Sequence, residues 1–239
     1  MKLKDKVAFI TGGARGIGEV FAKALVAEGA MAMIADISLE HGEQTAKAIR
    51  DAGGRASAVR CDVANDESIV IDDTLPHNRL YEMLRRRRPG SYFYTPGTAG
   101  GWAPGAALGA KLAAPDRDVI AVSGDGFYLF STANAALWSA RHYGAPYLTV
   151  VYQNRSYGTG TLRTRQFYPD GYSEKSGFDG GYFDPPIDFA KEAEACGAYG
   201  ENVREPSMLE AALQRGLIEV RKGRPAVVSV WMARHLQPD

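Results

Sequence analysis

The sequence predicts an α/β fold with parallel sheets, in which a short βαβ fragment precedes a larger, doubly wound domain. Short apolar runs alternate along the chain with segments whose apolar residues have helical spacing. Glycine-rich turns or polar residues follow several of these runs, as expected where parallel strands end at the carboxyl edge of a sheet. The length of 239 residues is enough for one large domain or two small ones.

Composition and charge exclude several classes of protein. Hydrophobic residues make up 45% of the chain and charged residues 23%, which is typical of a globular protein. Lysine plus arginine and aspartate plus glutamate both number 28, so no cationic surplus supports general binding to nucleic acid or to an anionic membrane. The two cysteines, Cys61 and Cys196, cannot form a disulfide framework. We therefore expect a reduced, cytoplasmic protein.

A glycine-rich turn follows the first apolar run, residues 7–10, and a helical pattern follows the turn. Its characteristic glycines are Gly12, Gly16 and Gly18. In such a turn one glycine makes the tight bend, one lets the backbone approach a pyrophosphate, and one lets the helix pack close to the strand. The N-terminus of the helix then offers free N–H groups to the phosphates.

The helix after this turn and the next two strands complete the fragment. Four apolar residues predict the buried face of the helix: Val20, Phe21, Ala24 and Leu25. The second apolar run, residues 31–35, ends in Asp36. A carboxylate there can accept both ribose hydroxyls of an adenosine and repels a 2′-phosphate, which favours NAD over NADP. A helix over residues 39–52 and a strand over residues 56–60 are expected next.

These residues resemble the N-terminal part of short-chain dehydrogenases. The resemblance covers residues 1–67 and implies a partial, Rossmann-like dinucleotide-binding unit. It implies that the three glycines form the cofactor turn, that Asp36 meets the adenosine ribose, and that Asp62 and Val63 flank the adenine. The resemblance then ends, because no tyrosine is followed four residues later by lysine and no Asn-Ala-Gly occurs. The residues that carry hydride transfer in that family are therefore absent.

A second strand–helix pattern begins near residue 68. Strands are expected over residues 68–71, 91–95, 119–123 and 147–153. Helices are expected over residues 78–88, 102–113 and 132–143. Residues 167–183, rich in aromatic residues, glycine and proline, are expected to form a long surface loop.

Polar residues end two of these strands. Gly124-Asp125-Gly126 follows one strand, and Asn154 ends the next. Parallel strands joined by a crossover helix place both ends at the same edge of a sheet, where α/β proteins bind ligands. Carboxylate and amide oxygens suit Mg²⁺, and the glycine N–H groups can cradle phosphates. The alternative for Asp125 is a plain turn aspartate between two glycines.

The segment 68–234 resembles the C-terminal, diphosphate-binding domain of thiamine-diphosphate enzymes of the benzoylformate decarboxylase and acetolactate synthase group. The motifs that carry the resemblance include Gly124-Asp125-Gly126 and Gln153-Asn154-Arg155-Ser156-Tyr157-Gly158. It implies that Mg²⁺ is ligated by the side chains of Asp125 and Asn154 and by the backbone carbonyl of Ser156. The contacts to thiamine diphosphate that it implies come from Thr74, Gly124, Gly126, Phe127 and Tyr157.

Two features depart from this family. The family places a bulky Met, Leu or Ile against the cofactor at the position of Gly100, so that side chain is missing here or supplied differently. The family's catalytic glutamate belongs to a separate pyrimidine-binding domain, which neither part of this sequence matches. We therefore assign no catalytic residue. The expected partners are a small-molecule cofactor and substrate, with a homo-oligomer or a complex with a pyrimidine-binding domain, and neither nucleic acid nor a membrane.

Three functions remain open, for a chain that joins a unit at residues 1–67 to a domain at residues 68–239. The first is a domain that binds thiamine diphosphate and Mg²⁺ in a 2-oxoacid decarboxylase or carboligase and needs a pyrimidine-binding domain for turnover. The second is a truncated NAD-dependent oxidoreductase of the short-chain type. The third is a non-catalytic fusion product.

Overall fold

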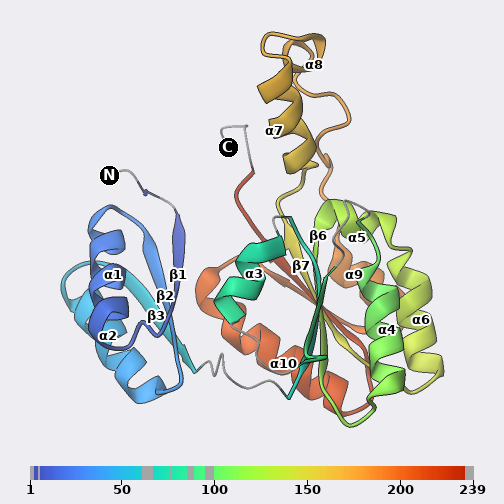
Figure 1. Ribbon diagram of the computed structural model, residues 1–239, viewed down its shortest axis with the longest axis horizontal. Coiled ribbons are helices and arrows are strands. Elements are labelled where there is room, and N and C mark those ends of the chain that lie inside the picture. The colour runs from blue at the N-terminus through green and yellow to red at the C-terminus, as the bar shows by residue number, and fades with distance from the viewer. Residues whose placement is uncertain are drawn as a thin grey trace. The chain divides into compact units, whose positions relative to one another are not determined.

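The structure is a computed structural model, and it describes residues 3–4, 6–60, 67–75, 77–84, 89–94 and 100–234. The chain divides into two compact units. Unit 1 consists of Met1–Asp66 and Tyr81–Arg87, and unit 2 consists of Glu67–Leu80 and Arg88–Asp239. Their helices and strands are labelled in Figure 1.

Unit 1 contains a three-stranded parallel sheet in the order β1-β2-β3. The strands are β1 (Val7–Thr11), β2 (Met31–Asp36) and β3 (Arg55–Arg60), and the helices are α1 (Gly16–Ala27) and α2 (Leu39–Asp51). Small and β-branched side chains from both helices and from the strands form one core, which includes Ala22, Ile34, Ile49 and Ala58. The alternation of strands and helices predicted for this fragment is confirmed.

The predicted buried face of α1 is wrong. Val20 and Phe21 are 66% and 58% exposed, and Ala24 is exposed as well, whereas Ala22 is fully buried. The side of α1 that packs into the core carries Ala22 and Val26, and Leu25 is half-buried. Apolar spacing marks an apolar side of the helix but does not tell which side meets the sheet.

Unit 2 contains a six-stranded parallel sheet in the order β5-β4-β6-β7-β9-β8. Its strands are β4 (Ile69–Asp73), β5 (Tyr92–Tyr94), β6 (Val119–Gly124), β7 (Leu148–Gln153), β8 (Tyr199–Val203) and β9 (Ala226–Trp231). β6 and β7 are neighbours in register, with Gly124 beside Tyr152. The carboxyl ends of these two strands therefore meet, as the sequence predicts.

Helices cover both faces of this sheet, which confirms the doubly wound α/β fold. One face packs against α4 (Ala103–Ala113), α5 (Asp125–Phe130), α6 (Ala133–His142) and α9 (Phe189–Ala195). The other face packs against α10 (Leu209–Arg221), which follows the short 3-10 turn η1 (Pro206–Met208). Figure 1 shows α4 and α6 on one side of the sheet and α10 on the other. Helix α3 (His77–Leu84) lies between β4 and β5 in the chain.

The segment predicted as a long loop contains regular structure. Helix α7 (Gly158–Phe167) leads into it, and α8 (Tyr172–Lys175) lies within it. Both helices project away from the sheet in Figure 1. Arg165 pairs with Glu174 at 2.8 Å, and Glu174 also accepts the N–H of Asp170 at 3.1 Å. Polar contacts of this kind leave no apolar periodicity in the sequence, which explains why the helices were missed.

Two further findings bear on the sequence expectations. Within the described ranges, no helix has both the length and the apolar character needed to cross a lipid bilayer. Cys196 carries a free thiol, and Cys61 lies outside the described residues.

Candidate functional site

Asp125 occupies the first turn of α5, directly after β6, and is only 1% exposed. One carboxylate oxygen accepts the N–H of Gly126 at 2.8 Å, and the other accepts the N–H of Arg155 at 2.5 Å. Burial raises the pKa of this carboxyl to about 6, against the opposing effect of the backbone N–H groups. Within the described part of the chain, no lysine or arginine pairs with Asp125. Its charge is therefore stabilised by N–H dipoles alone.

The turn after β7 brings Asn154 and Ser156 beside this carboxylate. Oδ1 of Asn154 accepts hydrogen bonds from the N–H and the hydroxyl of Ser156, both at 2.9 Å. Arg155, between them, has a φ of +60°, which turns its N–H toward Asp125. The guanidinium of Arg155 lies 5.2 Å from the centre of the Trp231 ring and donates to the carbonyl of Met232. Its positive charge is thus held away from the carboxylate.

The backbone around Ser156 is fixed by a bridge to Tyr182. The N–H of Tyr157 donates to the carbonyl of Gly181, and the N–H of Phe183 donates to the carbonyl of Arg155, both at 2.9 Å. These bonds belong to the neighbours of Ser156, so its own carbonyl takes no part in the pairing. The structure thus brings together the three residues predicted to ligate Mg²⁺, whose role as ligands stays a prediction.

Tyr157 lies against the glycine turn. A Cβ on Gly126 would lie 2.7 Å from Cδ1 of the Tyr157 ring, so only glycine leaves room for that ring. Phe130 stacks on Tyr157 with ring centres 5.7 Å apart, and Phe183 meets it edge-on at 4.7 Å. These aromatic rings form an apolar wall beside Asp125.

Phe127 occupies the space in front of Gly100. A Cβ on Gly100 would overlap three ring atoms of Phe127. A bulky side chain at position 100 would therefore displace that ring. Position 100 thus carries no side chain, and the ring of Phe127 occupies the space in front of it. The sequence shows a phenylalanine directly after the Gly-Asp-Gly turn, but it does not predict that the Phe127 ring points toward Gly100.

Thr74 directly follows β4, the neighbour of β6, and is hydrogen-bonded to Asp72. Its N–H and its hydroxyl both donate to Oδ1 of Asp72, at 2.9 and 2.6 Å. The hydroxyl of Tyr92 donates to the other oxygen of Asp72. Burial and the nearby Asp72 charge raise the pKa of Tyr92 far above its usual range. For Thr74 to bind a phosphate, as predicted, its hydroxyl proton must turn away from Asp72.

Sequence reasoning missed the roles of the two aspartates at the end of β4. Asp72 and Asp73 are both fully buried. Asp73 accepts the N–H groups of Gly101 at 2.8 Å and Ala103 at 3.4 Å, and so stabilises the start of α4. Two consecutive acids at the end of an apolar strand could have indicated that these carboxylates bind backbone or side-chain donors nearby.

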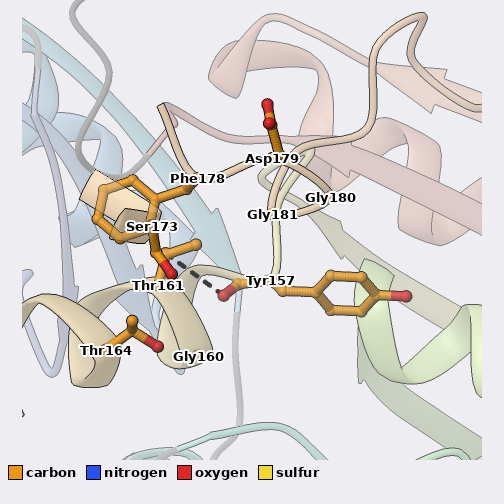
Figure 2. A pocket seen from close by; sticks show the side chains of 9 residues that line it. All are labelled: Tyr157, Gly160, Thr161, Thr164, Ser173, Phe178, Asp179, Gly180 and Gly181. Carbon is orange, nitrogen blue, oxygen red and sulfur yellow. Dashed lines mark hydrogen bonds between the residues drawn. The ribbon is translucent and has the colours of Figure 1, made fainter. Parts of the chain in front are cut away.

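A cavity of about 220 Å³ lies at the base of α7, between this helix and the loop that carries Gly180. Figure 2 shows that the Tyr157 ring points away from the other residues that line it. The hydroxyl of Thr161 donates to the carbonyls of Gly158 at 3.0 Å and Tyr157 at 3.4 Å. The lining combines hydroxyls, glycines, the aromatic residues Tyr157 and Phe178, and one exposed carboxylate, Asp179. The cavity is therefore separate from the wall that Tyr157 forms beside Asp125.

The glycine turn of unit 1 has the geometry that its sequence predicts. Gly12 and Gly16 have φ values of +65° and +59°. A Cβ on Gly18 would overlap the carbonyl oxygen of Gly12, so the close approach of helix and turn requires glycine there. The carboxylate of Asp36 accepts the N–H groups of Ala14 at 3.1 Å and Ser38 at 3.0 Å. It therefore orders the turn and keeps further lone pairs for a ligand.

Two further points concern the predicted site residues. Asp62 and Val63, predicted beside the adenine, lie outside the described residues. Across the described ranges, no three His, Cys, Asp or Glu side chains come together as a metal site. A metal at Asp125 would thus depend on amide and carbonyl oxygens as well as on one carboxylate.

Comparison with known families decides the class of unit 2. The family described as "Thiamine pyrophosphate enzyme, C-terminal TPP binding domain" matches residues 77–230, more than half of the chain. This chain belongs to the thiamine pyrophosphate enzyme family. Residues 6–71 match a second family, the short chain dehydrogenases. The chain is therefore chimeric, with a domain of the thiamine pyrophosphate family after a dehydrogenase-like segment.

Relatives match the two segments separately. Benzoylformate decarboxylase of Pseudomonas aeruginosa is 31% identical over 170 residues, which is 69% of this chain and 29% of that protein. The large subunit of acetolactate synthase isozyme 3 of Escherichia coli is 33% identical over 144 residues, 59% of this chain and 24% of that protein. Sorbitol dehydrogenase of Cereibacter sphaeroides is 51% identical over 69 residues, 29% of this chain and 26% of that protein. The chain thus matches between 24% and 29% of the length of these relatives.

A solved structure supports the fold. The thiamine diphosphate-dependent 4-hydroxybenzoylformate decarboxylase of Rhodococcus jostii RHA1 aligns with a TM-score of 0.60 and 20% identity. The alignment covers 87% of this chain and 45% of that structure. At this identity the likeness concerns the fold alone.

Proposed function

We propose that residues 68–239 bind thiamine diphosphate through Mg²⁺, as the diphosphate-binding domain of a 2-oxoacid decarboxylase or carboligase. The family implies the cofactor, and the buried carboxylate of Asp125 is the observation that carries the proposal for the metal. A carboxylate with only N–H partners gains most from a divalent cation, since a cation removes the cost of burying an unpaired charge.

The donor set fits Mg²⁺. The ligands would be the Asp125 carboxylate, the Asn154 side-chain oxygen and the Ser156 carbonyl, all hard oxygen donors. The two oxygens of Asp125 accept the N–H groups of Gly126 and Arg155, and a carboxylate offers more lone pairs than these two bonds use. Binding at Asn154 competes with the two bonds that its oxygen accepts from Ser156.

The remaining site residues would hold and cover the cofactor. N–H groups of Gly124 and Phe127 would donate to the diphosphate, and Thr74 would donate its hydroxyl. The Gly126 N–H, which donates to Asp125, would have to be shared with the diphosphate. Tyr157 would exclude water through the wall that it forms with Phe130 and Phe183. When bound, thiamine diphosphate supplies the electron sink for carbanion chemistry on a 2-oxo acid.

Turnover would require a second wall for the cofactor. The resemblance places the family's catalytic glutamate in a pyrimidine-binding domain, so we propose that a homo-oligomer or a partner chain supplies it. We also propose that the chain consists of a partial dinucleotide-binding unit at residues 1–67 and a diphosphate-binding domain at residues 68–239.

Isothermal titration calorimetry tests the proposal. The wild-type chain should bind thiamine diphosphate only when Mg²⁺ is present, and Asp125→Asn should weaken binding by about tenfold or more. Asp116→Asn changes an exposed aspartate of the same domain and should leave the affinity unchanged. The absence of wild-type binding, or equal affinity in Asp125→Asn, would contradict the proposal.

We also propose that unit 1 retains affinity for the adenosine half of NAD. The left-handed glycines of the turn and the Asp36 carboxylate at the end of β2 favour this candidate. NADH should quench or enhance protein fluorescence more strongly than NADPH, because Asp36 repels a 2′-phosphate. Asp36→Asn should reduce the preference for NADH over NADPH.

Dehydrogenase turnover is not expected, since the tyrosine–lysine pair is absent from the sequence. A cooperative unfolding transition without affinity for either cofactor would support a non-catalytic fusion product.

A further inference from the structure

A cationic cavity lies at the edge of the unit 2 sheet opposite Asp125. Its volume is about 460 Å³, and it is lined by Arg141, Gly197, Lys222, Gly223 and Arg224. These residues come shortly before the amino ends of β7, β8 and β9, which are adjacent in the sheet. The lining thus contains three cations and no carboxylate.

Arg141 lies in the last turn of α6, and the main chain already satisfies carbonyls at the ends of α9 and α10. Helices α9 and α10 end at left-handed glycines, Gly197 and Gly223, with φ of +77° and +96°. Their N–H groups donate to carbonyls of the last turn, at 2.8 Å to Glu194 and 2.9 Å to Val220. The N–H of Arg224 donates to the carbonyl of Glu219, also in α10, at 2.9 Å. Carbonyls satisfied by the main chain need less compensation from cationic side chains.

Two of the cations are held in place. The guanidinium of Arg224 donates to the carbonyls of Gly197 at 3.2 Å and Ala198 at 2.7 Å. Glu219 pairs with Lys222 at 2.9 Å and approaches Arg224 at 3.7 Å. One carboxylate therefore serves two of the three cations that line the cavity.

Arg141 supplies the donors that are still available. Its guanidinium lies directly over Gly197, where a Cβ would overlap Nη1, so glycine at that position makes room for it. Within the described ranges, Arg141 forms no ion pair. A guanidinium with a free planar edge matches the oxygen atoms of a phosphate in a bidentate arrangement.

We propose that this cavity binds a phosphate group carried by a small molecule, with Arg141 as its principal contact. The volume lies within the range of pockets that accept small molecules and exceeds what a free phosphate fills. Arg224 is held by its bonds to two carbonyls and Lys222 by its pair with Glu219. Both side chains therefore add positive potential at the cavity without a change of conformation. The proposal is independent of the thiamine diphosphate site, which lies at the other edge of the sheet.

Calorimetric titration without Mg²⁺ tests the proposal, with ribose 5-phosphate and inorganic phosphate as the two probes at constant ionic strength. Ribose 5-phosphate should bind, and Arg141→Ala should weaken its binding by about tenfold or more. Arg163→Ala removes another exposed arginine, on α7, and should leave the affinity unchanged. Tighter binding of the ester than of inorganic phosphate supports a phosphorylated small molecule as the ligand.

Arg141→Lys guards against an effect on folding alone. It keeps the charge but loses the planar edge, so the affinity should fall to a value between those of wild type and Arg141→Ala, with an unchanged melting temperature. Equal affinity in wild type and Arg141→Ala, no binding of either probe, or tighter binding of inorganic phosphate than of the ester would overturn the proposal.

Discussion

The ring of Phe127 lies so close to Gly100 that a Cβ at position 100 would overlap its Cγ, Cδ1 and Cε1 atoms. Gly100→Ala should therefore force the half-buried ring out of its position. We expect a loss of about 1–3 kcal/mol in the free energy of unfolding, as for other overpacked sites. Urea denaturation monitored by circular dichroism measures this change.

Gly109→Ala provides the matched control. Gly109 lies within α4, and a Cβ there would meet no atom within 4 Å. Alanine has the higher helix propensity, so this variant should gain about 0.5–1 kcal/mol. Equal effects of the two substitutions would contradict the contact between Phe127 and Gly100.

The sequence predicted the strands that precede the candidate site residues more reliably than it predicted where side chains point. Glycine spacing, and an acid or amide after each apolar run, depend on local backbone requirements that are visible in the residues themselves. The exposure of Val20 and Phe21 depends instead on which side of α1 packs into the core. The bonds from Thr74 to Asp72 likewise depend on rotamers that no spacing predicts.

Gln153 links β7 to two other parts of unit 2. It is 1% exposed, accepts the hydroxyl of Ser229 at 2.6 Å and donates to the carbonyl of Ile187 at 2.6 Å. Ser229→Ala would leave a buried amide oxygen without that donor, at an expected cost of about 1–3 kcal/mol in urea denaturation.

A neighbouring strand residue provides the control for Ser229→Ala. Thr149 is fully buried, and its hydroxyl has no hydrogen-bond partner among the described residues. Thr149→Val should therefore be neutral or stabilising, because it removes a polar group that makes no bond. If Ser229→Ala proved as stable as Thr149→Val, the bond to Gln153 would contribute nothing.

Arg155 adopts the left-handed conformation in the turn after β7, where its N–H donates to Asp125. Arg155→Ala and Arg155→Gly both lose the contact with Trp231, so they differ only in backbone preference. Since glycine tolerates a positive φ, Arg155→Gly should be more stable than Arg155→Ala by about 1 kcal/mol in urea denaturation. At Arg163, within α7, the order should reverse because alanine favours the helix. Alanine being the more stable residue at both positions would show that the turn does not require this conformation.

Glu201 on β8 forms a bidentate ion pair with Arg215 on α10, at 2.5 and 3.1 Å, and accepts the hydroxyl of Tyr199 at 2.5 Å. The Arg215 hydrogen bonds hold the pKa of the Glu201 carboxyl below its usual range. The unfolded chain therefore binds this proton more readily, so the stabilisation is present above the unfolded pKa and is lost as the pH falls through the folded one.

Glu201→Gln tests this pH dependence. It should lower the free energy of unfolding by about 0.5–1 kcal/mol at pH 7, because the pair is partly exposed. As the pH falls through the lowered pKa of Glu201, the wild-type carboxyl becomes protonated and the difference from Glu201→Gln should narrow. Glu194→Gln, an exposed site on α9, should show no such narrowing. A difference between wild type and Glu201→Gln that stayed constant from pH 7 to pH 3 would mean that the charge on Glu201 does not stabilise the packing of α10 on the sheet.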